Sequence, residues 1–164
     1  MNIETTNFPQ NIKSNKCLLP GYYWPIYLTN GSICIGMVLD LPLGKYVGST
    51  VSFFAGLLDW NSMKLPKDSN IRKCKLLECG NAHVGIIERD KQHIIGKIDL
   101  EDSEVKIPEM VTSAMYCEST KVIKAYTIIR KASPDDCNTM KCCSTWGLDV
   151  IKLYAQKYFL GNFA

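Results

Sequence analysis

Most of the chain consists of short apolar runs separated by polar breaks, which is typical of β-strands joined by turns. The clearest example is Asn30-Gly31, which lies between one apolar run ending at Leu28 and another starting at Ile33. Asn-Gly in this setting is typical of a hairpin with a two-residue type I′ turn, which needs φ > 0 at both central residues. We therefore expect a β-hairpin here, with Leu28 opposite Ile33.

Further strands are expected wherever β-branched and aromatic residues cluster. They cover residues 47–54, 74–79, 83–87, 93–98 and 122–130. The strand pattern ends before Gly56. The segments 83–87 and 93–98 flank a polar turn at Asp90-Lys91, which predicts a second hairpin. The segment 122–130 is almost continuously apolar, which predicts a central strand buried on both faces.

The last part of the chain has a helical pattern instead. Ser133-Pro134 followed by acidic residues is typical of a helix N-terminus, and this helix should end near Cys142. A second helix is predicted over residues 148–159, where apolar residues recur at helical spacing, and Gly161 should end it. Strands followed by helices predict an α+β fold, in which the C-terminal helices pack against a strongly bent antiparallel sheet or partial barrel.

The length of 164 residues suits one domain, which we place at 17–164, after a polar and flexible segment at 1–16. The N-terminus has no basic region followed by an apolar stretch, so a cytoplasmic protein is expected. No apolar run approaches the roughly 20 residues of a membrane-spanning helix. The eight cysteines are then expected to be reduced, because disulfides belong to oxidising compartments.

The formal net charge is +3 and the lysines are scattered, which does not favour a nucleic-acid binder. The one concentrated charge is the segment 99–104. Its four carboxylates are Asp99, Glu101, Asp102 and Glu104. They suit a basic protein partner or a divalent cation, and otherwise form a solvated loop.

No motif for catalysis or cofactor binding is present, and no cofactor or metal site is expected. The only histidines, His83 and His93, lie in no local Cys-His signature, so an enzyme is not expected. The cysteine spacings are wider than those of a zinc knuckle. The aromatic residues of the first strand suit core packing better than base stacking. They are Tyr22, Tyr23, Trp24 and Tyr27.

The first hairpin also resembles a known family. The opening of that family consists of a Pro-Gly pair, an apolar strand, a turn containing Gly, and a strand with Gly before a hydrophobic pair. In this chain the matching features lie in residues 20–28, Asn30-Gly31 and residues 35–39. This opening resembles that of the immunity protein 26 family, bacterial antidotes of polymorphic-toxin and contact-dependent inhibition systems. Phe53-Phe54 and the segment 93–96, followed by Pro108, resemble later elements of the family, with His93 where an aromatic is expected.

The resemblance covers about residues 19 to 110 and implies a mainly β immunity protein, a toxin inhibitor without catalysis. Many toxins of these systems are nucleases with basic clefts. We therefore expect a cytoplasmic monomer that binds a cognate nuclease toxin through the 99–104 carboxylates, with no nucleic-acid or membrane partner. The alternative is a nucleic-acid-associated small-barrel module that uses the aromatic strand and scattered lysines. A cysteine-dependent enzyme is the third class, recognisable by a thiol with a depressed pKa.

Overall fold

A computed structural model describes residues 8–42 and 49–161. Its strands are β1 (Tyr22–Tyr27), β2 (Ile33–Asp40), β3 (Ser52–Ser62), β4 (Leu76–His83), β5 (Gly96–Lys97), β6 (Glu109–Val111), β7 (Lys121–Lys124) and β8 (Thr127–Lys131). Its helices are α1 (Asp68–Ile71), α2 (Pro134–Thr139) and α3 (Val150–Leu160), with short 3-10 turns at Asn15–Cys17, Val84–Ile86 and Leu100–Asp102. These elements confirm the predicted α+β class.

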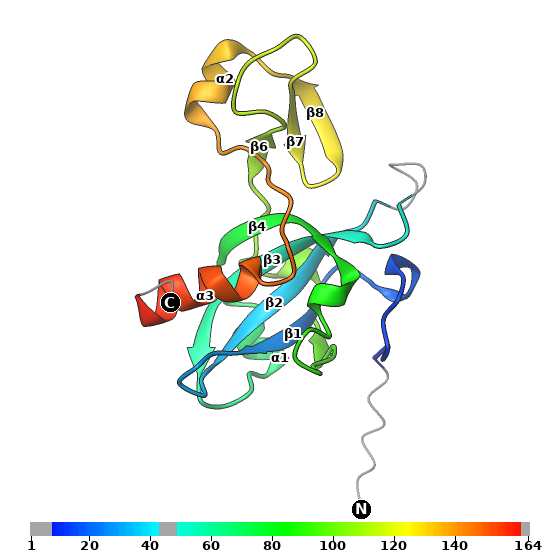
Figure 1. Cartoon of the computed structure of the whole chain (residues 1–164), viewed down its shortest axis with the longest axis vertical. Coiled ribbons are helices and arrows are strands. Elements are labelled where there is room, and N and C mark those ends of the chain that lie inside the picture. The colour runs from blue at the N-terminus through cyan, green and yellow to red at the C-terminus, as the bar shows by residue number, and fades with distance from the viewer. Residues whose placement is uncertain (1–7, 43–48, 162–164) are drawn as a thin grey trace, which may run out of the picture.

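The strands form two antiparallel sheets. The larger sheet has five strands in the order β4-β3-β2-β1-β5, and the smaller has the order β6-β7-β8. Figure 1 shows the smaller sheet and α2 as a lobe that projects from the body formed by the larger sheet. Because β4 and β5 lie at opposite edges of the larger sheet, the sheet is open and does not form a closed barrel.

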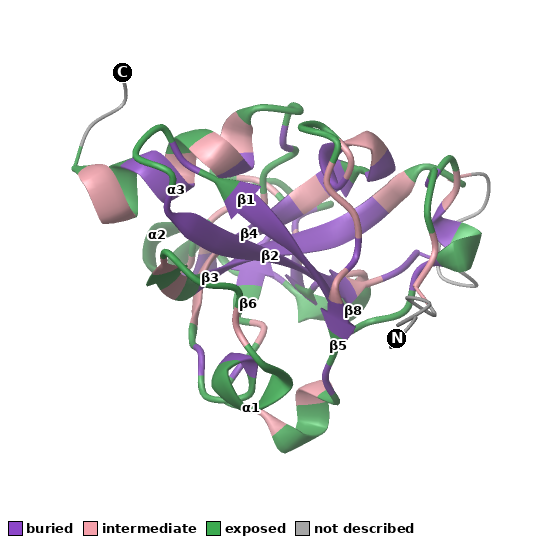
Figure 2. Cartoon of the chain, turned by 90° about the horizontal axis from the view of Figure 1, so that it is seen from below, coloured by how far each residue is buried: buried purple, intermediate pink, exposed green. Residues whose placement is uncertain are grey.

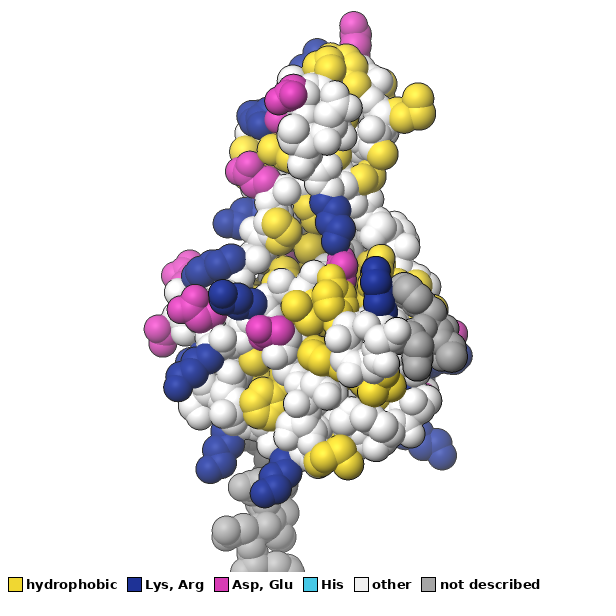
Figure 3. All heavy atoms as spheres, turned by 90° about the vertical axis from the view of Figure 1, so that its left-hand side faces the viewer, with side chains coloured by type: hydrophobic (Ala, Val, Ile, Leu, Met, Phe, Trp, Pro, Cys, Tyr) yellow, Lys and Arg dark blue, Asp and Glu magenta, His cyan; other side chains and the backbone are white. Residues whose placement is uncertain are grey.

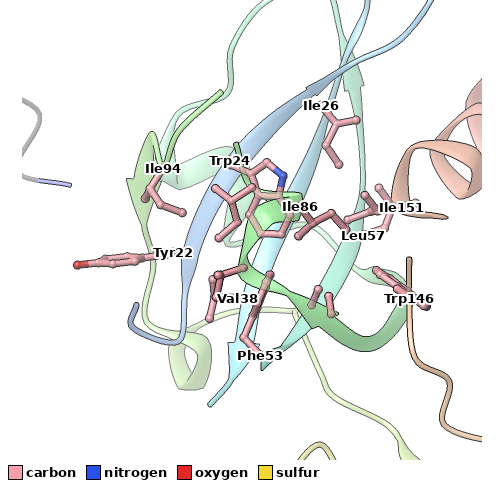
Figure 4. Close-up of a cluster of buried hydrophobic side chains, with 14 of the residues drawn as sticks. Tyr22, Trp24, Ile26, Val38, Phe53, Leu57, Ile86, Ile94, Trp146 and Ile151 are labelled. Atoms are coloured by element: carbon pink, nitrogen blue, oxygen red, sulfur yellow. The ribbon is translucent and has the colours of Figure 1, made fainter. Parts of the chain in front are cut away.

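Both faces of the larger sheet are buried, which explains why its strands are apolar without alternation. One face carries Trp24 and Phe53 and packs against Trp146 and Ile151 of the C-terminal segment, as Figure 4 shows. The central strands are correspondingly buried along most of their length (Figure 2). The expected packing of the last helix on the sheet is therefore confirmed.

The opposite face of the larger sheet joins the two lobes. Phe54 of β3 shares one buried cluster with Met110 and Ile123 of the smaller sheet. The rings of Phe54 and Tyr126 meet edge to face, with centroids 5.7 Å apart. The smaller lobe is therefore attached through apolar contacts. Among the described residues, its own separate core consists of Val111, Val122 and Ala132.

The first hairpin is confirmed, but its predicted turn and register are wrong. Gly31 has φ 81°, whereas Asn30 is not among the residues with positive φ. The Gly31 N–H donates to the Leu28 carbonyl, and Leu28 pairs with Ser32, so the loop has three residues and Tyr27 lies opposite Ile33. This is a type I turn followed by a left-handed glycine, the usual alternative to the two-residue loop. The Asn30 side chain accepts from the Ser32 N–H at 3.0 Å, which favours this arrangement.

The predicted second hairpin is also wrong. Residues 84–86 form a 3-10 turn, and β5 pairs with β1 rather than with residues 83–87. In addition, β3 continues past Gly56 to Ser62. Of the predicted strand 47–54, residues 47 and 48 lie outside the described residues. A long-range partner, β4, supports β3 through the stretch where its local pattern breaks.

The predicted central strand 122–130 is two strands. Lys124 lies opposite Thr127, and Ala125 between them has φ 52°, so the chain reverses within the apolar run. β7 is buried at Val122 and Ile123, whereas every residue of β8 is exposed. An apolar run of strand length therefore does not show whether the chain passes through the core once or turns at its edge.

The helix boundaries follow the predicted caps. Ser133 and Asp136 form a reciprocal capping box at the start of α2, and Gly161 has φ 73° after α3. α2 ends at Thr139, earlier than Cys142. At the other end of the chain, the described part of segment 1–16 contributes buried Ile12 and Asn15. The predicted flexibility of that segment and the extent of a single domain remain predictions.

Candidate functional site

The acidic segment forms a well-defined turn between two buried residues, Ile98 and Val105. The Asp99 carboxylate accepts from the Glu101 N–H at 3.0 Å and caps the 3-10 turn Leu100–Asp102. The turn is further held by Ser103, whose hydroxyl donates to the Leu100 carbonyl at 2.8 Å. The segment is therefore fixed at both ends and across its middle by the backbone.

The four carboxylates of this acidic turn, defined as residues 99–104, point to solvent. Asp99, Glu101, Asp102 and Glu104 are all exposed. None of them forms an ion pair with any residue in the described parts of the chain. The backbone N–H of Glu104 donates to the Arg72 carbonyl at 2.8 Å, which ties the turn to α1 rather than neutralising it. The charges of the turn are thus available to a partner.

A groove of about 700 Å³ runs beside the acidic turn, between the two lobes. Asp99 and Glu101 line it, but Asp102 and Glu104 do not. Its wall also carries the cations Arg72, Lys97 and Lys124. The groove is therefore mixed in charge. Figure 3 shows, on one face of the molecule, acidic and basic side chains interspersed near the narrow region between the two lobes.

Sequence reasoning found the carboxylates but missed the groove. Arg72 follows α1 and Lys124 ends β7, so both are far from residue 99 along the chain. Lys124 meets the turn because the smaller lobe packs against the larger sheet, whereas Arg72 is held beside the turn by the hydrogen bond from the Glu104 N–H to its carbonyl. No local signal in the sequence indicates this meeting.

The aromatic strand does not form a base-stacking platform. Tyr22, Tyr23 and Trp24 are at most 9% exposed, and only Tyr27 reaches 37%. Their role in the core, the favoured interpretation of the sequence, is confirmed for the three buried rings. Within the described residues, no three Cys, His, Asp or Glu side chains are grouped so that they could hold a metal ion.

Cys117 is the most distinctive thiol. All eight cysteines are free, and this one is exposed on the smaller lobe. Its sulfur lies 3.1 Å from the Ser119 hydroxyl and 3.2 Å from the Thr120 hydroxyl. These hydrogen bonds stabilise the thiolate and lower the pKa of Cys117 to about 7. The partners are hydroxyls rather than an imidazole, so the arrangement lacks the general base of a Cys-His nucleophile.

Alkylation of Cys117 should report this lowered pKa directly. The thiolate is the reactive form, so the rate of reaction with iodoacetamide should rise with pH and be half-maximal near pH 7. Ser119→Ala removes the first hydroxyl and should move the midpoint upward. Peptide mass spectrometry separates Cys117 from Cys17, the other exposed cysteine. A midpoint at the ordinary value of about 8.5, or one unmoved in Ser119→Ala, would contradict this assignment.

Comparison with protein-family models finds no match, and comparisons with curated proteins and with solved structures find no significant similarity. In the described part of the chain, no helix has both the length and the apolar character needed to cross a membrane.

Proposed function

We propose that this chain is an immunity protein that binds and neutralises a protein toxin, with the acidic turn entering the basic substrate cleft of a nuclease. The observation that carries the proposal is the combination of exposure and order in that turn. Its carboxylates have no cationic partner in the described structure, while the backbone that bears them is hydrogen bonded and anchored by buried residues.

Such a surface suits inhibition on physical grounds. A turn that is already ordered loses little conformational entropy on binding, so more of the contact energy is retained as affinity. Carboxylates facing a basic cleft also speed association through electrostatic steering. Because the whole chain has a net charge of +3, this steering must come from the local charge of the turn.

The resemblance of residues 19–110 to the immunity protein 26 family supports the same proposal and implies a bacterial protein. The competing nucleic-acid module loses its main support, because three of its four stacking rings are buried. The lowered pKa of Cys117 is the one feature expected of a cysteine-dependent enzyme, but its hydrogen-bond partners are hydroxyls and no imidazole lies among them.

A genetic experiment tests the proposal. The reading frame directly upstream of the gene is expressed from an inducible promoter, with and without this chain. We expect growth arrest when it is expressed alone, growth when the two are co-expressed, and a stable complex of the purified proteins. An upstream product that is harmless alone, or lethal in both cultures, contradicts the proposal.

A further inference from the structure

The smaller sheet has one open edge, the strand β8. All five of its residues are exposed, and Ile128 and Ile129 retain 58% and 43% of their accessible surface. In the described sheet, β8 has β7 as its only neighbour, and Figure 1 shows it on the outer side of the smaller lobe. Exposed edge strands with apolar side chains are templates for pairing with another chain.

The other edges are protected. β4 is covered by the segment 144–146, through the Asn81–Thr145 bridge, and β6 is covered by Lys141–Cys143. β5 is only two residues long. The chain thus covers or shortens the remaining edges that the structure describes, and β8 is the exception.

The backbone of β8 is oriented for pairing. The Ala132 N–H donates to the Thr120 carbonyl across the β7–β8 pair at 3.0 Å. Peptide groups alternate in direction along a strand, so those of the preceding residue, Lys131, point away from β7. The Lys131 carbonyl accepts from the Arg130 guanidinium at 3.4 Å, so the Lys131 N–H is the backbone group that this edge offers to a partner, beside the exposed isoleucines.

The charges near β8 indicate which kind of strand could pair with it. Lys121 and Lys131 lie directly opposite each other in the β7–β8 register, an unfavourable pairing of like charges. Neither has an ion-pair partner within residues 8–42 and 49–161. Lys124 adds a third exposed cation at the turn between the strands. A second copy of β8 would add further lysines beside Lys131, whereas an acidic strand would offset the repulsion between Lys121 and Lys131.

We propose that β8 binds an extended acidic segment of another protein by strand addition. Backbone hydrogen bonds to the β8 edge supply the affinity, carboxylates of the partner face Lys131, and apolar residues of the partner cover Ile128. This inference goes beyond the proposed function, because β8 and the acidic turn are oppositely charged and therefore suit different surfaces.

The test uses a fluorescent peptide of roughly eight alternating Glu and Val residues, the length of an ordinary strand. Fluorescence anisotropy at low salt should show saturable binding to the intact chain. Lys131→Glu should weaken binding about tenfold, because a favourable cross-strand pair becomes a repulsive one. Lys64→Glu is the control. It changes the net charge by the same amount as Lys131→Glu, but at an exposed position on the larger lobe, and it should leave peptide binding unchanged. Lys131→Glu also removes the clash with Lys121, so it should fold at least as well as the parent.

Other probes separate strand addition from simple charge attraction. A peptide of alternating Glu and Pro has the same charge but lacks half of its amide donors, and it should not bind. Equal binding of the two peptides, or equal binding by Lys131→Glu, overturns the proposal. Tighter binding of a single-stranded oligonucleotide of matched charge, or concentration-dependent dimers in sedimentation, would also overturn it, because the occupant would then be a nucleic acid or a second copy.

Discussion

Gly21→Ala is expected to destabilise the protein by about 3 kcal/mol. Gly21 has φ 95°, a conformation that L-residues adopt only at a cost. A Cβ atom there would also overlap the carbonyl oxygen of Ile98, which is backbone and has little freedom to move away. The same residue links three strands, because its N–H donates to Val38 and its carbonyl accepts from Ile98. The substitution therefore adds steric overlap to backbone strain at the start of β1, between β2 and β5.

Gly31→Ala is the matched control. Gly31 has a similar φ of 81°, but its Cβ would meet only the end of the Met63 side chain, at 3.7 Å. It should cost about 1 kcal/mol, the strain of a left-handed residue alone. Urea unfolding with an unchanged m-value gives both free energies. Equal losses in the two variants would show that steric overlap at Ile98 contributes nothing.

Reversal of the acidic turn should have the largest effect on function. Replacing Asp99, Glu101, Asp102 and Glu104 with Lys is expected to abolish protection against the toxin, since like charges facing a basic cleft cost several kcal/mol. Most of these changes should be neutral for folding, within about 0.5 kcal/mol each. Asp99 is the exception, because it caps the Glu101 N–H and its loss should cost about 1 kcal/mol.

A double variant avoids that complication. Glu101→Lys with Asp102→Lys reverses two exposed charges without touching the cap at Asp99. Glu109→Lys with Glu118→Lys changes the net charge equally at exposed positions outside the turn. Only the first pair should slow association with the toxin, and its effect should shrink as salt rises. If both pairs behave alike, the interaction depends on net charge and the acidic turn is not the binding surface.

The sequence alone determined the features that depend on neighbours along the chain. Asn30-Gly31 predicted a hairpin, Ser133-Pro134 predicted the start of α2, and Gly161 predicted the end of α3. Each of these rests on a local hydrogen bond or a backbone conformation, which a few adjacent residues decide. The four carboxylates of the acidic turn were found in the same way, because their density is visible without a fold.

Tertiary structure alone decided which segments pair over long distances. β5 joins β1, across more than 70 residues, although its local pattern favoured a hairpin with residues 83–87. β3 extends through Gly56 because β2 and β4 flank it on both sides. The groove beside Asp99 exists because the smaller lobe brings Lys124 to it, and the exposed edge exists because the run 122–130 reverses at Ala125. These outcomes depend on which apolar faces bury each other, and that competition is settled by packing of the whole chain rather than by any local segment.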